Sequence, residues 1–325
     1  MRVFSGIRPT GGLHIGNYLG AIKQWIELQK KADCVFCIVD WHAITTPYNP
    51  KKLQKYIQEV ALTYLTAGVN PKKSILFVQS QVKEHSELAW LLGTLTPVGD
   101  LLRMAQYKEK SSQFKQGPGA GLLNYPILMA ADILLYQTDV VPVGKDQVQH
   151  VELAREIAKR FNRRFGRVFK VPEAQIPKIG AKIMCLQNPK KKMSKTGNPK
   201  GCLGLFASEK EIKEKIMKAV TDPGKEIRYN PTKKPGISNL LVIYSGFSKK
   251  PVKEIEKEFR GKGYAEFKQS LTKLLIESLK PFRQAKKELS EKQIQKILDN
   301  GAQKARRIAQ TTIFQVRQKM GLNAT

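Results

Sequence analysis

Early in the chain, short apolar runs alternate with amphipathic stretches, and this alternation limits the folds that the sequence can adopt. Cys34 to Val39 and Ser74 to Val78 are nearly continuous apolar runs, which is typical of strands covered on both faces. Between them, apolar residues recur at helical spacing from Leu53 to Leu65, after Asn49-Pro50 and before Gly68. This alternation predicts an α/β fold with a doubly wound, Rossmann-like parallel sheet.

The pattern changes twice along the chain. Residues 106–121 are rich in charged residues and glycine and predict a flexible loop, and helical spacing returns at 127–136 and 146–161. After Phe206 the strand pattern mostly disappears, and 208–220, 252–259, 264–279 and 291–320 are helix-like. We therefore predict a catalytic domain over 1–205 and a helical domain over 206–325, with the last helix packing back on the first domain.

The chain is strongly basic. It carries 57 Lys and Arg against 27 Asp and Glu, a net charge of +30, while its apolar fraction of 41% is ordinary. Such an excess favours a polyanionic partner, nucleic acid first, although a host with lysine-rich proteins would give the same balance. No apolar leader and no uncharged run long enough to span a bilayer occurs, so we expect a cytoplasmic protein without membrane contact.

The four cysteines, Cys34, Cys37, Cys185 and Cys202, are too few and too scattered for a disulfide framework. Cys34 and Cys37 form a Cys-x-x-Cys pair, but residues three apart on a strand point to opposite faces. No second pair completes a zinc site. Buried free thiols and no protein-bound metal are therefore expected.

Two distant segments have the chemistry of a nucleotide site. His14-Ile15-Gly16-Asn17 lies where a strand over 3–6 meets a helix. There, Gly16 lets a ligand approach the backbone, the helix N-terminus favours negative charge, and His14 can donate to a phosphate oxygen. Lys192-Met193-Ser194-Lys195-Thr196 places two ammonium groups three residues apart on a glycine-flanked loop.

Here the sequence resembles a known family. The segment from Ser5 to Asn17 resembles the first signature of class I aminoacyl-tRNA synthetases, and Lys192 to Thr196 resembles the second. The stretches Asp40–Thr45, Tyr125–Tyr136 and Val141–His150 resemble the bacterial-type tryptophanyl-tRNA synthetases in particular, over essentially the whole chain. The resemblance implies activation of tryptophan by ATP, release of pyrophosphate and transfer of tryptophan to its tRNA.

Within this resemblance, Asp132 is expected to accept the N–H of the tryptophan indole. Met129 and Asp132 are three apart on one predicted helix and face the same way. Tyr125 and Gln147 are expected near the substrate ammonium group, with His42 nearby, although His42 and His150 fit a purely structural role equally well. Apolar walls are expected from Phe4, Met129, Val141 and Val143.

Activation needs positioning and charge stabilisation rather than a base, because the tryptophan carboxylate is already a nucleophile. The expected catalytic residues are Lys192, Lys195, Thr196 and, from the flexible loop, Lys110, with Mg²⁺ on the triphosphate. The resemblance implies further ATP contacts from Arg8, Pro9, Thr10, His14, Gly16, Asn17, Gly144, Lys145, Asp146, Ile183, Met193 and Ser194.

Two positions depart from the family pattern. Arg8 stands where many relatives have glutamine, and Thr196 replaces the usual final serine of the second signature. The first adds a positive charge beside the substrates and the second keeps the hydroxyl. We expect them to affect the rate and inhibitor sensitivity rather than the reaction class.

The helical region is expected to bind the tRNA anticodon, with Lys286, Lys287, Lys304, Arg306 and Arg307 along its phosphates. Relatives are symmetric dimers, so a homodimer is expected. No editing domain is visible, which fits a substrate with the largest standard side chain.

Three other functions compete with this interpretation. A tyrosyl-tRNA synthetase would share the fold and both signatures, but a phenol needs both a donor and an acceptor, which the Met-Ala-Ala-Asp helix does not suggest. A non-catalytic RNA-binding paralogue would not need Lys192 and Lys195. A small-molecule nucleotidyl transferase would not need the basic helical third.

Overall fold

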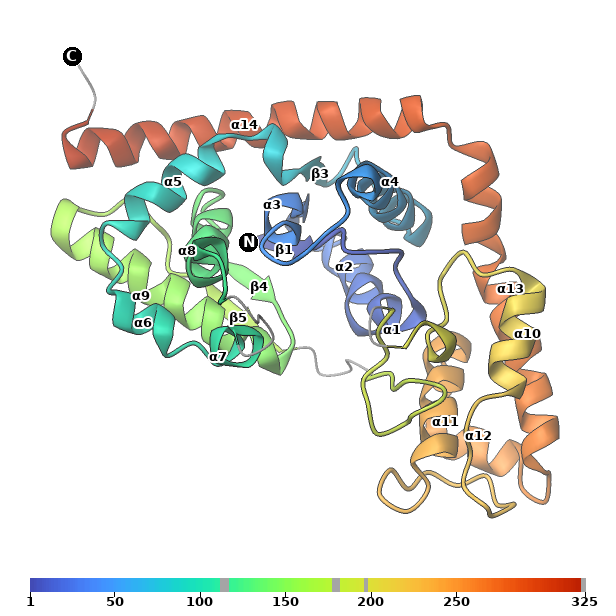
Figure 1. The fold of residues 1–325 in the computed structure, drawn as a ribbon. Coiled ribbons are helices and arrows are strands. Elements are labelled where there is room, and N and C mark those ends of the chain that lie inside the picture. Colours follow the sequence, from blue (N-terminus) through green and yellow to red (C-terminus); the bar gives the residue numbers. More distant parts are fainter. Residues whose placement is uncertain (112–116, 177–181, 196–197, 323–325) are drawn as a thin grey trace.

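Five parallel strands form one sheet in the computed structural model, which describes residues 1–111, 117–176, 182–195 and 198–322 (Figure 1). The strands lie in the order β3-β2-β1-β4-β5. They are β1 (Arg2–Ile7), β2 (Asp33–Ile38), β3 (Ile75–Val78), β4 (Val140–Pro142) and β5 (Glu173–Gln175). The chain order reverses between β1 and β4, and this topological switch point is where open α/β sheets bind ligands. The predicted parallel sheet is confirmed.

Helices cover both faces of this sheet. In the first two thirds of the chain they are α1 (Ile15–Asn17), the π-helical η1 (Tyr18–Ile22), α2 (Lys23–Leu28), α3 (Asp40–Ala43), α4 (Pro50–Ala67), η2 (Gln79–Gln81), α5 (Glu84–Gly93), α6 (Val98–Leu102), α7 (Ala105–Ser111), α8 (Ala120–Leu134), η3 (Lys145–Gln147), α9 (Val148–Phe165) and η4 (Pro199–Gly201). Helix α4 has the predicted ends: the Asn49 side chain accepts from Lys51 N–H, and Gly68 ends the helix at φ +109°.

Two apolar cores lie on opposite faces of the sheet. Val3, Cys34 and Phe36 face the core that α2 and α4 cover, whereas Phe4, Val35 and Cys37 face the core that α8 and α9 cover. All four cysteines are free and buried, as predicted. No helix of the described residues is both long and apolar enough to cross a membrane.

One predicted element differs from the structure. The sequence pattern predicts a loop over 106–121, but α7 extends through Ser111 and α8 already begins at Ala120, with Pro126 inside the helix. Helix α7 is short and mostly polar, so it lacks the apolar spacing by which a helix is predicted.

The last third of the chain is helical, with α10 (Glu209–Met217), α11 (Pro235–Ser248), α12 (Val252–Glu258), α13 (Tyr264–Glu288) and α14 (Glu291–Met320). Helices α10 to α13 gather at one end of the molecule, and α14 runs back along the side of the sheet towards α5 (Figure 1). A methyl group on Gly301 would lie 1.8 Å from Leu76 O, so α14 packs directly on the backbone of the edge strand β3. It thereby covers an edge that would otherwise be open to pairing.

Candidate active site

A cavity of 340 Å³ opens where β1 and β4 end. Its walls come from β1, β4, the start of η3 and the inner face of α8. All the side chains predicted to surround the amino acid line it, namely Phe4, His42, Tyr125, Met129, Asp132, Val141, Val143 and Gln147. Of the predicted ATP contacts, Arg8, Asn17 and Gly144 line it as well. The volume is at the small end of the range for ligand pockets.

Asp132 is the buried charge of this cavity. Its side chain is 2% exposed, and His42 Nε2 donates to Oδ2 at 2.8 Å while His85 Nδ1 donates to Oδ1 at 2.6 Å. Burial alone would raise the pKa of Asp132, but the two histidines outweigh it and hold the pKa well below its ordinary value. The cavity therefore contains a carboxylate, which only accepts hydrogen bonds.

Tyr125 lines the cavity from the same helix, two turns before Asp132. Its hydroxyl lies 2.7 Å from His150 Nε2, and its ring packs edge-on against His42. Burial raises the pKa of Tyr125 to about 12, partly offset by the nearby charge of Arg8, so the hydroxyl stays protonated at neutral pH. His150 thus supports a wall of the cavity, while His42 is part of the cavity itself.

The first signature forms a self-capped helix start. His14 Nδ1 accepts from Gly16 N–H at 3.1 Å, and Asn17 Oδ1 accepts from His14 N–H at 3.1 Å. Because Nδ1 accepts, the ring proton of neutral His14 sits on Nε2, where it can be donated to a ligand. Burial, then the charges of Lys192 and Lys195, lower the pKa of His14 to about 4.

Backbone pairing brings the second signature to the first. Ile15 N–H donates to Leu203 O and Leu205 N–H donates to Leu13 O, so residues 203–205 run beside the first signature. Just before them, Met193 N–H donates to Ile183 O and closes a hairpin that carries Lys192. Two segments far apart in sequence thus lie side by side.

The two lysines of the second signature lie over the first. A methyl group on Gly12 would come within 2.6 Å of Lys195 Nζ and 3.0 Å of Glu59 Oε2. Lys192 lies close enough to His14 and Asp146 to affect the pKa of both. Both lysines are exposed, so their ammonium groups can reach an anion between the signatures.

The other predicted ATP contacts lie in or beside the two signatures and at the start of η3. Asp146 Oδ1 would be 2.7 Å from a methyl group on Gly144, and Lys145 is exposed beside it. Ile183 is buried within 3.4 Å of the position of a methyl group on Gly16. Pro9 is buried, and Thr10 and Ser194 lie in the two signature turns.

Some predicted residues differ from expectation or lie outside the described part. The Met193 side chain is in the apolar core, so it anchors the loop instead of facing a ligand. Thr196 and the side chain of Lys110 lie outside the described residues. Lys304 Nζ and Arg306 contact the carbonyls of Pro71 and Gln81. These two side chains therefore attach α14 to the segments on either side of β3, and they do not belong to the basic surface of the helical end.

Sequence reasoning missed two residues that hold the site together. His85 and Gln79 both contact Asp132 and are fully buried. His85 stands on the same α5 face as the buried Leu88 and Leu92, and a histidine in an apolar stripe was the available signal. Among the described residues, no group of three or more His, Cys, Asp or Glu is placed to hold a metal ion.

Comparison with known proteins identifies the family. The model of class I tRNA synthetases for tryptophan and tyrosine (W and Y) matches residues 1–280. A tryptophan–tRNA ligase of Bacillus anthracis is 50% identical over 323 residues, 99% of this chain and 98% of that protein.

Two solved structures of tryptophanyl-tRNA synthetases are similar to this chain over nearly its whole length. The tryptophanyl-tRNA synthetase of Mycoplasma pneumoniae has a TM-score of 0.90 at 35% identity, covering 99% of this chain and 98% of the other. That of Campylobacter jejuni, solved with ADP and tryptophan, has a TM-score of 0.85 at 39% identity over 99% of this chain and 100% of the other. The chain belongs to the class I tRNA synthetases for tryptophan and tyrosine, in their bacterial tryptophanyl branch.

Proposed function

We propose that the cavity between β1, β4 and α8 binds the tryptophan side chain, with ATP beside it between the two signatures. The chain catalyses the tryptophan–tRNA ligase reaction of its family. Tryptophan and ATP give tryptophanyl-adenylate and pyrophosphate, and tryptophan then passes to the 3′ end of its tRNA with release of AMP. The observation that carries the assignment is the ionised Asp132 in an apolar cavity, which suits a large ring with one N–H donor.

In the first step the tryptophan carboxylate attacks the α-phosphorus of ATP, and the bond to the pyrophosphate oxygen breaks. Negative charge develops on the leaving group, and Lys192 and Lys195 stabilise it; their closeness to the first signature supports this role. The Nε2–H of His14 donates to a phosphate oxygen as a neutral group. Mg²⁺ accompanies the triphosphate, whose oxygens are ligands that it prefers.

The assignment is tested by pyrophosphate exchange with each standard amino acid. Tryptophan should support much faster exchange than tyrosine. The indole of tryptophan offers Asp132 a single N–H donor on a ring that fits this cavity, and the phenol of tyrosine does not. Equal exchange with tyrosine and tryptophan would contradict it. One adenylate formed per active site in a titration would exclude a non-catalytic RNA-binding role.

We further propose that a basic groove at the helical end binds tRNA phosphates, so that residues 1–205 serve activation and 206–325 serve anticodon binding. The groove has a volume of 720 Å³ and lies between the 225–228 segment and the residues around α12. Its cations are Lys225, Arg228, Lys253, Lys257, Arg260 and Lys262, against the two carboxylates Glu226 and Glu256. These side chains lie apart from Lys304 and Arg306, which contact the sheet edge.

The salt dependence of tRNA affinity tests this groove. Removing one cation that binds a phosphate should reduce the slope of log K against log salt by about 0.7 to 0.9. Lys257→Gln and Arg260→Gln should each do so, whereas Lys304→Gln should leave the slope close to that of the wild type. If neither groove variant changes the slope of log K against log salt, the groove does not bind tRNA phosphates.

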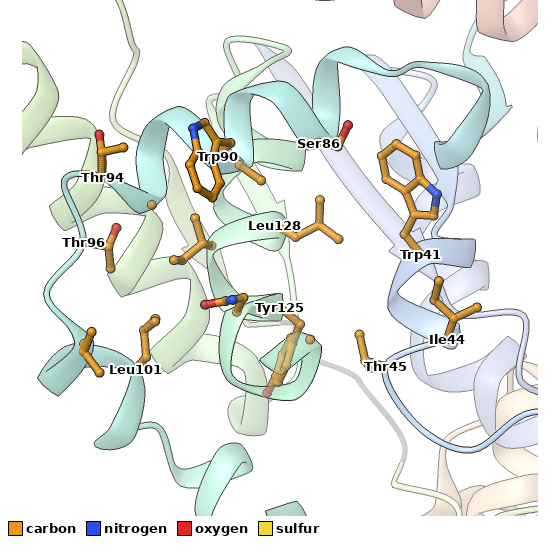
Figure 2. A pocket seen from close by; sticks show the side chains of 16 residues that line it. Trp41, Ile44, Thr45, Ser86, Trp90, Thr94, Thr96, Leu101, Tyr125 and Leu128 are labelled. Atoms are coloured by element: carbon orange, nitrogen blue, oxygen red, sulfur yellow. The ribbon is translucent and has the colours of Figure 1, made fainter. Parts of the chain in front are cut away.

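A homodimer in the cytoplasm completes the proposal. A groove of 680 Å³ lies beside the substrate cavity and shares Thr45 and Tyr125 with it. Figure 2 shows Trp41 and Trp90 on either side of Leu128. Trp90 is 77% and Val98 60% exposed, which is unusual for large apolar side chains.

We propose that a second copy of the chain covers this groove. Sedimentation should show a wild-type dimer that Trp90→Asp converts to a monomer, while Phe314→Asp, at an exposed aromatic residue on α14, leaves the dimer intact. A monomeric wild type, or a dimer that survives Trp90→Asp, would contradict the proposal that this groove is the dimer interface.

A further inference from the structure

The carboxylate of Asp132 receives three hydrogen bonds from the protein. His85 Nδ1 and Gln79 Nε2 donate to Oδ1 at 2.6 Å and 2.7 Å, and His42 Nε2 donates to Oδ2 at 2.8 Å. The three donors come from α3, η2 and α5, whereas Asp132 is on α8. Four separate elements are therefore joined at one carboxylate.

The orientation of each Oδ1 donor is fixed by a further contact. Gln79 Oε1 accepts from Trp41 N–H at 3.1 Å, so the amide must present its NH₂ group to Asp132. Tyr136 Oη lies 2.7 Å from His85 Nε2. Burial raises the pKa of Tyr136 well above its ordinary value, so its hydroxyl keeps a proton to donate and the proton of the His85 ring sits on Nδ1.

One oxygen of the carboxylate keeps an open acceptor position. A carboxylate has about two lone-pair directions on each oxygen. Oδ1 accepts two N–H groups and is saturated, while Oδ2 accepts, from the part of the chain that the structure describes, only that of His42. Among the described residues that line the cavity, Asp132 and His42 are present and neither His85 nor Gln79 is. The open position on Oδ2 therefore lies on the cavity side.

We propose that His85 and Gln79 are positioning residues for substrate selection, which saturate Asp132 Oδ1 so that Oδ2 is the one acceptor offered to the indole N–H. This inference rests on the proposed role of Asp132 as the indole acceptor. Selection of tryptophan then depends on two side chains that never touch the substrate. The hydrogen bonds from His85 and Gln79 also prevent the carboxylate of Asp132 from rotating to bind a second donor.

The test compares two substrates that differ at one atom. β-(3-Benzothienyl)alanine has a sulfur where tryptophan has N–H, in a ring of the same shape. Pyrophosphate exchange by the full-length enzyme gives kcat/KM for both, and the wild type should prefer tryptophan by roughly 10- to 100-fold. His85→Leu should reduce this preference by about tenfold, through KM for tryptophan more than through kcat.

His85→Asn is the conservative variant, because its amide can still donate at the Nδ1 position, and it should retain most of the preference. The ratio is measured on one preparation, so it does not depend on the fraction of enzyme that folds. Gln79→Leu and Tyr136→Phe test the same network from two other points and should lower the ratio as well. Tyr64→Phe, at another fully buried tyrosine on the opposite face of the sheet, is the matched control and should not.

Two results would be decisive against the proposal. If His85→Leu and Gln79→Leu slow both substrates equally, the wild-type ratio persists and the two residues serve only folding. If the wild type itself shows no preference for tryptophan over the analogue, the proposed role of Asp132 fails, and the inference fails with it. The first result leaves the proposed function intact and the second does not.

Discussion

The two ends of the candidate site are built differently. At the indole end, Asp132 is buried, ionised and held by three donors from three elements. At the phosphate end, the charges belong to exposed lysines on a loop beside the first signature. The backbone hydrogen bonds to that signature come from the neighbouring residues 203–205. One end is rigid before any ligand arrives, and the other leaves its charges free to move.

This difference matches two physical tasks. Choosing one side chain among twenty requires an acceptor that cannot adapt to a wrong partner, so preorganisation is favoured. Stabilising a leaving pyrophosphate requires positive charge where negative charge develops, and the charges must then release the product. Variants at the two ends should therefore affect different kinetic constants.

The largest effect is expected at the phosphate end. Lys195→Ala should lower kcat for adenylate formation roughly 100- to 1000-fold with little change in KM for ATP, because the ammonium acts on charge that appears in the transition state. Single-turnover adenylate formation measures it. Lys190→Ala removes an exposed lysine from the same loop and is the control; an equal reduction there would mean that the loop supplies only general positive charge.

A smaller effect of the opposite kind is expected at the indole end. Asp132→Asn should raise KM for tryptophan roughly 10- to 100-fold and leave KM for ATP nearly unchanged, since the variant has no charged acceptor. It should also lower the melting temperature, because an amide turns one NH₂ group towards histidine or glutamine donors. Asp33→Asn, at the exposed start of β2, is the control. Normal tryptophan kinetics in Asp132→Asn would remove this residue from the pocket.

Gly16→Ala should weaken ATP binding by roughly tenfold without affecting tryptophan binding. The added methyl group would lie 2.9 Å from His14 Nδ1, so the ring must move away from its cap and the donor on Nε2 moves with it. Equilibrium dialysis with each ligand separates the two effects. Gly263→Ala, where a methyl group meets no atom within 4 Å, should change neither affinity.

The last prediction concerns the pH dependence of stability rather than a kinetic or binding constant. Burial and two lysines hold the pKa of folded His14 at about 4 against 6.5 ordinarily, so between these values the unfolded chain binds more protons. The free energy of unfolding should therefore fall as pH falls from 6.5 to 4, by at most about 3 kcal/mol from this group. His14→Asn keeps a capping side chain and should show a shallower fall in urea unfolding; an identical fall in both proteins would contradict the assigned pKa.

The sequence predicted the parts of the molecule that depend on local pattern. Apolar runs located β1, β2 and β3, and Asn49 and Gly68 located the ends of α4. Residues that share a helix face, such as Met129 and Asp132, were placed correctly towards one cavity. Contacts that depend on tertiary packing could not be predicted: His85 and Gln79 reach Asp132 from elements about fifty residues away.

Tertiary packing also explains the other differences. Lys304 and Arg306 looked like free basic side chains because nothing in the sequence says that α14 lies against β3. Met193 looked like part of a ligand loop, yet its apolar side chain anchors that loop in the core. In each case a long-range contact decided the role of the side chain.

A crystal structure of the full chain with tryptophan and a non-hydrolysable ATP analogue would show whether the indole binds Asp132 and the triphosphate lies between the two signatures. We expect the indole nitrogen within hydrogen-bonding distance of Asp132 Oδ2, with Oδ1 still bound by His85 and Gln79, and the triphosphate between His14 and Lys195. An indole bound away from Asp132, or a triphosphate that leaves Lys192 and Lys195 without contact, would contradict this claim.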